Sequence, residues 1–389
     1  MQGVFVHDHK FPRYGEAYYH SYGFDNEFFN RYLNIFDKFD IIARETKIDF
    51  EEAIKTPTVN EKVDFISISN YVQLKSSFIR DNIDRKINES DCVIVRLPSI
   101  LGLYAIRSAK KHNKPYLIEV VGCPWDAFWQ QNIYKKLIAP IITILCKKAI
   151  YDAGYVVYVT EDYLQNKYPT LGSSISCSNV TLPSVDEINL RKRIEKIKKL
   201  DSNKNVIIGT CSTVDALYKG QQYMIEAIAR LKSKGYKIEY QLVGGGDPSF
   251  LKSIAKKFGV EDDVRFLGKL KHADVFTWLD QIDIYVQPSR TEGLPRSVIE
   301  AMSRGCPVFG SNAGGIPELI DNEFVFKKGN VDGICNVYKK FTYEVMKNHA
   351  LLNYKNSKKY LQSVLYERRI SFFKEFIKGA VLKEKEVKE

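Results

Sequence analysis

The sequence lacks three features that would mark a secreted or membrane-spanning protein: paired cysteines, a signal-peptide pattern and a long apolar run. Seven cysteines are scattered along 389 residues without a C-x-x-C pair, so we expect a reducing cytosol, with neither a disulfide framework nor a cysteine-based metal site. The N-terminus, MQGVFVHDHKFPRYG, has neither the basic nor the apolar region of a secretory signal. The apolar stretch nearest to a membrane span, residues 137–146, is far shorter than the ~20 residues needed. These absences predict a cytoplasmic protein.

Lysine and arginine outnumber aspartate and glutamate by 58 to 47, and the formal net charge is +11. Nucleic acid, an anionic membrane or a phosphorylated substrate would each suit this excess. The lysines are dispersed, and the sequence holds no zinc-finger or aromatic RNA-binding motif, so we do not expect nucleic acid as a partner. An anionic membrane and a phosphorylated substrate remain.

The chain is long enough for two domains. Strand and helix patterns alternate through the first half, and the alternation starts again at residues 205–210. This predicts an α/β fold with two doubly wound, Rossmann-like domains that face a central cleft. We expect an N-terminal domain over residues 1–190, a C-terminal domain over 191–362 and, over 363–389, a helix that packs back toward the N-terminal domain and ends in a frayed tail. The charged segment 186–205 fits either an interdomain connection or a solvated surface helix.

Two glutamates eight positions apart, Glu292 and Glu300, stand where an expected strand gives way to a helix. Gly293 lets the backbone approach a ligand closely, and Pro295 suits the first turn of a helix. Free amides at such a helix start bind phosphate, and here they belong to Arg296, Ser297 and Val298. The Glu300 side chain leans back toward the same end. The pattern suggests a ligand with hydroxyls at both ends and phosphates between them, such as a nucleotide sugar. Two ordinary polar residues at a helix start fit the spacing equally well.

A longer set of motifs carries a resemblance to a known family. In chain order they are Lys219-Gly220, Val243-Gly244-Gly245-Gly246, Phe266-Leu267-Gly268, Glu292-Gly293-Leu294-Pro295, Glu300-Ala301-Met302, Gly305-Cys306-Pro307-Val308 and Gly314-Gly315-Ile316-Pro317-Glu318. They resemble the C-terminal signature of retaining GT-B glycosyltransferases with the E-x7-E motif, the group 1 or family 4 glycosyl transferases. The resemblance covers residues 205–320. It implies a GT-B fold and a hexosyltransferase that retains the anomeric configuration.

The resemblance also implies roles for individual residues. Glu292 would orient the sugar, Lys219 would contact the diphosphate, and Glu300 would bind the ribose. The full donor-binding set would be Thr210, Ser212, Lys219, Gly244, Glu292, Gly293, Leu294, Pro295, Arg296, Ser297, Val298 and Glu300. The diphosphate itself would help to take the acceptor proton. No D-x-D metal site stands out in the sequence, so we expect no metal and no cofactor.

One family feature is missing from the sequence. The family has an arginine in a G-R-L turn after the first strand of this domain, whereas the chain reads Gly209-Thr210-Cys211-Ser212. Arg290 and Arg296 are the candidates to replace it, although each also fits an ordinary surface arginine.

The N-terminal half resembles, more loosely, bacterial transferases that build capsule or O-antigen polysaccharide. The stretches HDHKF, GFDNEFFNRYLNIFD and EVVGCPWDAFW carry this resemblance. His7, Asp8 and His9 follow the expected first strand VFVH, and Trp125 and Asp126 lie in a later turn. We expect His7, His9, Trp125 and Asp126 on the acceptor side, with Asp126 also a catalytic candidate beside Glu292 and Lys219. A capped turn around a buried Trp125 is the alternative, and His272 is expected only to start a helix.

Residues 133–148, IYKKLIAPIITILCKK, place lysines on both sides of an apolar stretch. The segment fits an interfacial helix on an anionic membrane or a core helix of the N-terminal domain. The partners expected overall are a nucleotide-sugar donor, a saccharide or polyprenyl-linked saccharide acceptor and a peripheral membrane contact. Two other functions fit the same fold: a nucleotide-sugar epimerase and a non-catalytic scaffold that binds a sugar nucleotide.

Overall fold

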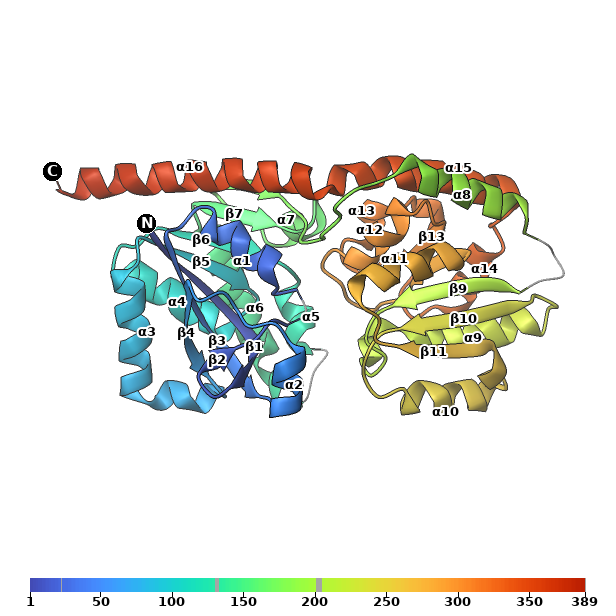
Figure 1. Cartoon of the computed structure of the whole chain (residues 1–389), viewed down its shortest axis with the longest axis horizontal. Coiled ribbons are helices and arrows are strands. Elements are labelled where there is room, and N and C mark those ends of the chain that lie inside the picture. The colour runs from blue at the N-terminus through green and yellow to red at the C-terminus, as the bar shows by residue number, and fades with distance from the viewer. Residues whose placement is uncertain (22, 130–132, 201–204, 389) are drawn as a thin grey trace. The chain divides into compact units, whose positions relative to one another are not determined.

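A computed structural model of the protein describes residues 1–21, 23–129, 133–200 and 205–388. Internal contacts divide the chain into two compact units. The first unit comprises Met1–Val159, Gln165–Ser176 and Arg368–Glu389, and the second comprises Thr160–Leu164 and Cys177–Glu367. Each unit holds a parallel sheet with helices between its strands (Figure 1), so the predicted pair of doubly wound α/β domains is confirmed.

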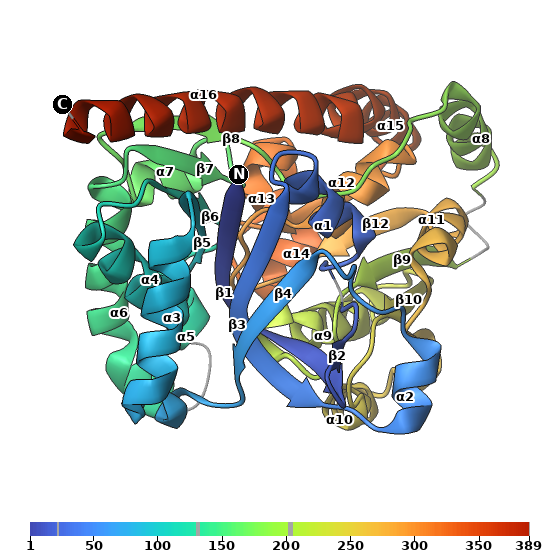
Figure 2. The same cartoon turned by 60° about the vertical axis from the view of Figure 1, so that its left-hand side comes forward.

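The first unit is built on a parallel sheet with strand order β4-β3-β1-β5-β6-β7-β8, and β2 pairs antiparallel with β1. Helices α3, α4 and α6 pack together along one side of this sheet (Figure 2). The elements are β1 (Gln2–Tyr14), β2 (Ala17–Tyr18), α1 (Asn26–Leu33), β3 (Lys38–Lys47), α2 (Phe50–Lys55), β4 (Val63–Ile68), η1 (Tyr71–Lys75), α3 (Ser77–Glu89), β5 (Cys92–Leu97), α4 (Ile100–Lys111), β6 (Tyr116–Val120), α5 (Pro124–Trp129), α6 (Ile133–Tyr151), β7 (Tyr155–Tyr158), α7 (Tyr163–Lys167, whose first two residues lie in the second unit) and β8 (Ser173–Ser176).

Strand β1 is longer than the sequence predicted. The expected strand ended at His7, with His7–His9 opening the loop that follows. Instead β1 runs on to Tyr14, because it pairs with β3 and then turns back through β2. Its pairing with β5 stops at Val6, and its register with β3 shifts between Val6 and Lys10. His7–His9 therefore lie inside a strand, at the point where it passes the end of β5.

Aromatic side chains fill the core of the first unit on the side of α1. Tyr32 stacks on Phe39 with ring centroids 4.7 Å apart. Phe373, from the part of α16 that belongs to this unit, meets Tyr32 edge-on at 5.9 Å. The C-terminal helix thus contributes directly to the N-terminal core.

A buried ion pair crosses the same core between β5 and β6. Arg96 donates to Glu119 at 2.7 Å, and the Tyr32 hydroxyl donates to the other carboxylate oxygen at 2.8 Å. Burial alone would raise the pKa of Glu119, but Arg96 and further arginines lower it to about 2. The carboxylate is therefore ionised in the folded protein.

The second unit has a parallel sheet with strand order β11-β10-β9-β12-β13-β14. Its core gathers around Ile208, Met224, Ile228, Leu242 and Val286. The elements are α8 (Glu187–Lys198), β9 (Val206–Cys211), η2 (Leu217–Lys219), α9 (Gln221–Lys232), β10 (Ile238–Val243), α10 (Ser249–Phe258), η3 (Glu261–Asp263), β11 (Val264–Gly268), α11 (His272–Gln281), β12 (Ile284–Gln287), α12 (Arg296–Ser303), β13 (Val308–Ser311), α13 (Ile316–Leu319), η4 (Asn322–Phe324), β14 (Val325–Phe326), α14 (Val331–Tyr338), α15 (Tyr343–Ser357), η5 (Lys358–Tyr360) and α16 (Gln362–Lys388, which belongs to the first unit from Arg368 onward).

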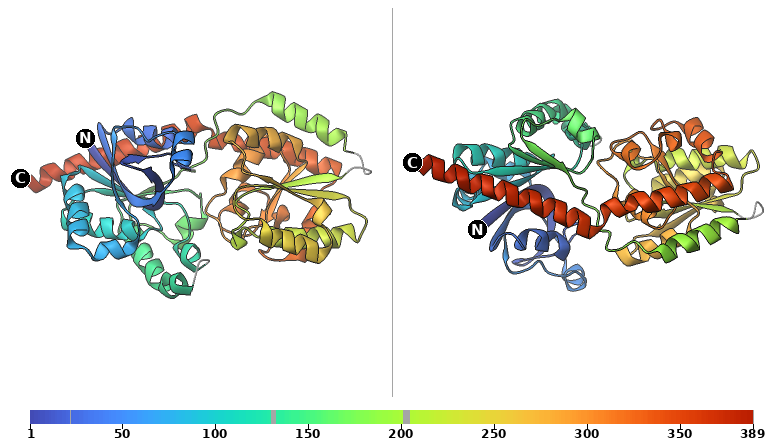
Figure 3. Two further views of the ribbon diagram at one scale, coloured as in Figure 1. Left: turned by 60° about the horizontal axis from the view of Figure 1, so that its bottom comes forward. Right: turned by 90° about the horizontal axis from the view of Figure 1, so that it is seen from above.

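The charged segment 186–205 forms helix α8 over most of its described part, and this helix is docked rather than solvated all round. It lies against α15 (Figure 3, right). Arg193 is buried, and its guanidinium donates to the carbonyl oxygens of Leu279, Ile282 and Arg304. Residues 201–204 of the segment lie outside the described residues.

Helix α6 is not a core helix. It buries Ala139, Cys146, Ala149 and Ile150, whereas most of its larger apolar side chains are exposed. Within the described ranges, no helix combines the length and apolarity that crossing a bilayer requires.

Candidate functional site

The second sheet changes direction between β9 and β12. From β9 the chain adds β10 and β11 on one side, and from β12 it adds β13 and β14 on the other. Ligands of open parallel sheets bind at such a switch point, beyond the carboxyl ends of the strands. The loops that follow β9 and β12 carry Lys219 and Glu292, so the fold brings two predicted site residues to this position.

A glycine makes the close approach of these two loops feasible. Gly220 follows η2 with φ of 74°, and a side chain there would place its Cβ 2.0 Å from the carbonyl oxygen of Pro288. Only glycine fits this contact without displacing the backbone. The contact holds Lys219 beside the β12 loop.

The Glu292 carboxylate is held by several donors on one of its oxygens. Oε1 accepts from Lys219 Nζ at 2.8 Å, from Gln287 Nε2 at 2.9 Å and from Ser289 Oγ at 2.7 Å. Oε2 accepts no hydrogen bond from the part of the chain that the structure describes. One oxygen is thus fixed by the protein, and the other is available to a ligand hydroxyl.

Gln287 and Ser289 were missed by the sequence analysis. Gln287 ends β12, and its side-chain oxygen accepts from the Tyr285 hydroxyl at 2.8 Å, which fixes the amide orientation. The Tyr285 hydroxyl in turn accepts from Cys211 N at 3.2 Å. The sequence did offer a signal for Gln287 and Ser289: both are polar, and they follow an apolar strand at the edge of the sheet where ligands bind.

The loop between β12 and α12 is fixed from its other side by β13 and α13. Gly315 N donates to Gly293 O at 2.7 Å. A Cβ on Gly314, whose φ is 58°, would lie 2.0 Å from Glu292 O. The Gly314-Gly315 pair therefore sets the backbone position of Glu292 and Gly293.

Helix α12 starts without a side-chain cap. Its N-cap is Pro295, and no side-chain hydrogen bond satisfies the first amides. The sequence predicted free backbone amides at Arg296, Ser297 and Val298, and these residues lie at this uncapped helix start. The side chain of Val298 is fully buried. Such a start can accept an anion.

Glu300 lies one turn into α12 and is 7% exposed. Its Oε1 is 3.1 Å from Nε2 of His272, the first residue of α11. The sequence predicts His272 only as the start of a helix, whereas the fold makes it the neighbour of the second glutamate. This contact joins residues 28 positions apart, so no local pattern could have indicated it.

The turn after β9 holds the remaining predicted positions. Thr210 is fully buried, and its hydroxyl contacts Val286 O and the Tyr240 hydroxyl, both at 2.8 Å. Ser212 N donates to Val243 O at 2.8 Å, which links the turn to the strand before Gly244. Thr210 thus lies inside the sheet, and Ser212 and Gly244 lie at its carboxyl edge.

The two candidate replacements for the missing arginine differ in position. Arg290 is exposed, and its guanidinium donates to the Tyr223 hydroxyl at 3.2 Å. Arg296 is half-buried and is the first residue of α12, directly after the buried Leu294 and Pro295. Arg296 is therefore the one at the uncapped helix start.

In the first unit, the switch point lies between β1 and β5, and His7, Asp8 and His9 occupy it. Asp8 accepts from Ile100 N at 2.6 Å and Leu101 N at 3.0 Å, which uses both of its oxygens at the start of α4. This capping is a structural role that the sequence did not reveal.

The two histidines are neutral at physiological pH. Burial, assisted by the positive charge of Arg96, lowers the pKa of His7 to about 3 and that of His9 to about 4. His7 Nδ1 lies 3.2 Å from Arg96 O, and His9 Nε2 lies 2.6 Å from Ser21 Oγ. Each can offer a neutral ring nitrogen but not a positive charge.

Trp125 and Asp126 lie in the short helix α5. Trp125 is only half-buried, so the alternative of a turn around a buried tryptophan does not hold. It stacks on Trp129, with ring centroids 4.8 Å apart. Asp126 is in the first turn of the same helix.

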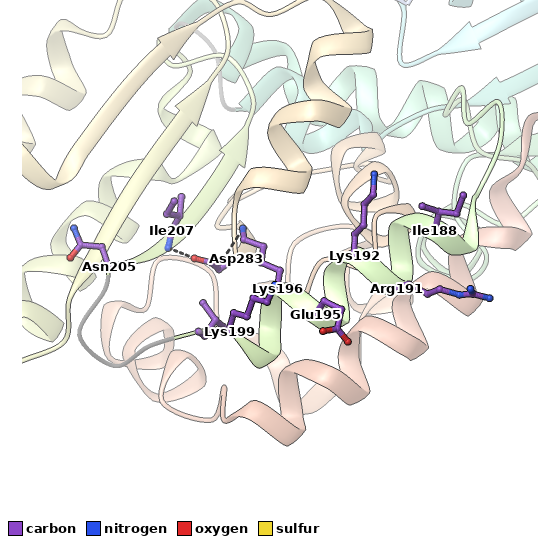
Figure 4. Close-up of a pocket in the computed structure, with 10 residues that line it drawn as sticks. Ile188, Arg191, Lys192, Glu195, Lys196, Lys199, Asn205, Ile207 and Asp283 are labelled. Atoms are coloured by element: carbon purple, nitrogen blue, oxygen red, sulfur yellow. Dashed lines mark hydrogen bonds and ion pairs between the residues drawn. The ribbon is translucent and has the colours of Figure 1, made fainter.

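One cavity lies away from these residues (Figure 4). It is formed by α8 together with Asn205, Ile207 and Asp283, which stand at the amino ends of β9 and β12. Lys196 pairs with Asp283 at 2.8 Å, and Asp283 also accepts from Ile207 N at 2.8 Å. The cavity is at the opposite edge of the sheet from Glu292, and its central charges are already paired.

The described residues contain no group of three or more His, Cys, Asp or Glu side chains arranged to hold a metal ion.

Comparisons with known proteins identify the family. The chain is 36% identical over 379 residues to Protein CapJ of Staphylococcus aureus, covering 95% of this chain and 94% of that one. It is 38% identical over 111 residues, 27% of each chain, to the amylovoran biosynthesis glycosyltransferase AmsK of Erwinia amylovora. The crystal structure of Anabaena HepE in complex with UDP superposes with a TM-score of 0.65 at 16% identity, covering 96% of this chain and 100% of that one. The profile of the Glycosyl transferases group 1 family matches residues 191–351. The chain therefore belongs to the group 1 glycosyl transferases and is a glycosyltransferase with the GT-B fold.

Proposed function

We propose that this glycosyltransferase moves a hexose from a nucleotide sugar to a saccharide, or a polyprenyl-linked saccharide, in the biosynthesis of a surface polysaccharide. The observation that carries the proposal is the arrangement at the second switch point. Glu292 has one fixed oxygen and one available oxygen, the uncapped start of α12 follows it, and Glu300 lies one turn further on. The relative AmsK is named as an amylovoran biosynthesis glycosyltransferase, which supports the polysaccharide context.

The donor would span this arrangement. Sugar hydroxyls would donate to Glu292 Oε2, the diphosphate would meet Lys219 and the α12 amides, and the ribose hydroxyls would donate to Glu300. The UDP complex of HepE makes a uridine nucleotide the first choice for the base. Arg296 would supply the second positive charge in place of the absent arginine.

The proposed reaction retains the anomeric configuration. The acceptor hydroxyl oxygen bonds to the anomeric carbon on the face from which the diphosphate leaves, and the proton passes to a diphosphate oxygen. The protein then has two tasks: to position the reactants and to stabilise the charge of the leaving diphosphate. Lys219 and the α12 amides perform the second task, and we propose that no metal ion or cofactor is needed.

We assign the acceptor to the first unit, with His7, His9, Trp125 and Asp126 as its contacts. The neutral rings of His7 and His9 can exchange hydrogen bonds with sugar hydroxyls, and the stacked Trp125 and Trp129 offer a flat surface of the kind that pyranose rings pack against. Asp126 would accept a hydrogen bond from a neighbouring hydroxyl of the acceptor and so orient the attacking oxygen, whose own proton passes to the diphosphate. The enzyme would work in the cytoplasm, at the inner face of the cell membrane, where a polyprenyl-linked acceptor would be found.

The first test is a thermal-shift panel of UDP, GDP, ADP and CMP sugars on the wild-type protein and Glu300→Ala. A ligand at 100 times its dissociation constant stabilises the folded state by ~2.7 kcal/mol. We expect one nucleotide, UDP first, to stabilise wild type and the control Glu323→Ala equally, and Glu300→Ala much less. If no nucleotide stabilises the protein, with or without a saccharide acceptor, the donor-site assignment is wrong. Stabilisation by a sugar nucleotide without transfer to any acceptor would instead indicate a scaffold.

The second test follows transfer itself. With the donor identified, NMR of the product should show the anomeric configuration of the donor, and EDTA should leave the rate unchanged. Conversion of the donor sugar without any acceptor would instead indicate an epimerase.

A further inference from the structure

Helix α6 presents a wide apolar face that the rest of its own unit leaves uncovered. Tyr134 is 76% exposed, Leu137 70%, Ile141 60% and Ile144 67%. Ile138 and Leu145 are exposed as well. These positions recur at intervals of three and four residues, which places them on one side of the helix. A contiguous exposed apolar surface of this kind marks a binding surface rather than ordinary surface variation.

The helix is also firmly attached through its other side. Ala139, Cys146, Ala149 and Ile150 are buried, and α6 packs against α4 and α5 (Figure 2). Three of these four residues are small, which allows close packing, while most of the larger apolar side chains are exposed. The exposed face is therefore presented on a fixed element.

The charges of α6 are all of one sign. Lys135 and Lys136 stand in its first turn, Lys147 and Lys148 stand near its end, and residues 133–151 contain no aspartate or glutamate. Of these lysines, Lys147 and Lys148 are exposed. An apolar face flanked by basic side chains is the pattern of a helix that lies in the interface of an anionic bilayer.

A second copy of the chain is a poorer occupant for this face. A two-fold dimer would bring the same face of α6 together with itself. Four lysines on each helix, without an intervening acid, would then lie close to four more. This repulsion opposes dimerisation, whereas the same lysines attract a negatively charged lipid surface.

We propose that the exposed face of α6, formed by Tyr134, Leu137, Ile138, Ile141, Ile144 and Leu145, docks the protein on an anionic lipid bilayer. The helix lies in the plane of the membrane, with its apolar side chains among the lipid headgroups and Lys136, Lys147 and Lys148 on the lipid phosphates. Docking would hold the enzyme where a lipid-linked acceptor is found, and this purpose rests on the proposed function. The docking itself does not depend on the donor or on turnover.

The test is co-sedimentation of the full-length protein with vesicles of phosphatidylglycerol and phosphatidylcholine, compared with phosphatidylcholine alone. We expect binding to the anionic vesicles that is at least ~10-fold stronger and that weakens in high salt. Leu137→Ser combined with Ile141→Ser and Ile144→Ser should weaken this binding at least ~10-fold. Lys147→Gln combined with Lys148→Gln should reduce the preference for anionic lipid.

A matched control alters exposed apolar residues elsewhere in the first unit. Val72 is 67% exposed and Phe78 is 70% exposed, so Val72→Ser with Phe78→Ser removes similar side chains from η1 and α3. This variant should bind vesicles as wild type does. Circular dichroism and the nucleotide thermal shift, repeated on every variant, establish that the fold and donor site are intact.

Three outcomes would overturn the proposal. The α6 triple variant could bind vesicles as wild type does, or wild type could show no preference for anionic lipid. Sedimentation velocity could instead reveal a wild-type dimer that the triple variant loses, which would make α6 an interface between copies. If nucleotide stabilises the wild-type protein but the protein does not bind vesicles, only the docking proposal is rejected. If the protein binds vesicles but no nucleotide stabilises it, only the donor-site assignment is rejected.

Discussion

Glu292 is the residue whose surroundings define its chemistry most narrowly. Lys219, Gln287 and Ser289 all donate to Oε1, which leaves Oε2 for a ligand. In Glu292→Gln the amide oxygen can replace Oε1, but an NH₂ group then stands where the ligand hydroxyl needs an acceptor. A hydrogen bond to a charged group is worth about 1.5–3 kcal/mol, so kcat/KM should fall by between about 10-fold and 150-fold. Steady-state kinetics measure this, with the exposed Glu323→Gln as a control that should match wild type.

His272 is a positioning residue for Glu300 if the ribose assignment is correct. Its Nε2 lies 3.1 Å from Glu300 Oε1. Ribose contacts are the same in the ground state and the transition state, so their loss raises KM without lowering kcat. We expect His272→Ala to raise the donor KM about threefold to tenfold, from the ~0.5–1.5 kcal/mol of one hydrogen bond. His272→Gln should recover most of this, whereas an equal fall in kcat would argue against a positioning role.

His349 makes the second unit sensitive to acid. Its ring lies 3.8 Å from that of Phe324, and burial lowers its pKa to about 4 from an ordinary 6.5. Between these values the unfolded chain binds a proton that the folded chain does not, so the unfolding free energy falls as the pH falls. The slope is about 1.4 kcal/mol per pH unit, or about 2 kcal/mol between pH 7 and pH 5.

Urea unfolding at both pH values checks this prediction. His349→Phe keeps an aromatic ring and removes the titrating group, so its loss of stability between pH 7 and pH 5 should be smaller than that of wild type by about 2 kcal/mol. An unchanged difference would mean that the histidine is protonated equally in the folded and unfolded states.

At the scale of whole elements, α8 is held to the second unit by two buried side chains, Arg193 and Ile197, and Arg193 is the one that makes hydrogen bonds. Arg193 donates to the carbonyls of Leu279, Ile282 and Arg304. Arg193→Ala would leave these carbonyls short of a charged donor, and we expect a loss of about 2–4 kcal/mol in unfolding free energy. Arg191, on the same helix but exposed, provides the control, since Arg191→Ala should change stability by less than about 0.5 kcal/mol. Chemical unfolding measures the free energy of unfolding of both variants. Because both replace an arginine of α8 with alanine, the difference between them reports the docking of Arg193 and not helix propensity.

The elements also show what the sequence could and could not predict. The strands and helices of the second unit follow local apolar patterns, and the motifs shared with a known family are sufficient to indicate Lys219, Glu292 and Glu300. Gln287 and His272 were missed because their roles depend on neighbours brought together by the fold. The predicted end of β1 was wrong because pairing with β3 and β2 extends the strand beyond its apolar stretch.

The same limit applies to α6 and α8. Both have the composition of amphipathic or charged helices, and composition states which side chains are available but not which face is covered. The buried side of α6 is made of Ala139, Cys146, Ala149 and Ile150, and most of its larger apolar side chains are exposed. The sequence EINLRKRIEKIKKL suggests that Arg193 is one more surface charge, although it is the charged residue of that segment that the fold buries, together with Ile197.

At the scale of the whole molecule, the chain contains two units with separate cores, and the proposed donor residues all belong to one of them. Each unit holds its own sheet, and Lys219, Glu292 and Glu300 lie in the unit formed by Thr160–Leu164 and Cys177–Glu367. A ligand that binds one folded unit raises the stability of that unit by mass action. UDP should therefore act on the second unit more than on the first.

Differential scanning calorimetry of the full chain, with and without UDP, tests this. Val298→Ala removes fully buried methyl groups from α12 in the second unit, and Val95→Ala does the same to β5 in the first. Each should destabilise its own unit by about 1–3 kcal/mol and so assign the transitions. Saturating UDP should then raise the transition that Val298→Ala lowers, while the transition that Val95→Ala lowers moves less. Equal shifts would show that the two units unfold as one cooperative body, and a shift confined to the first unit would move the nucleotide site away from Glu292.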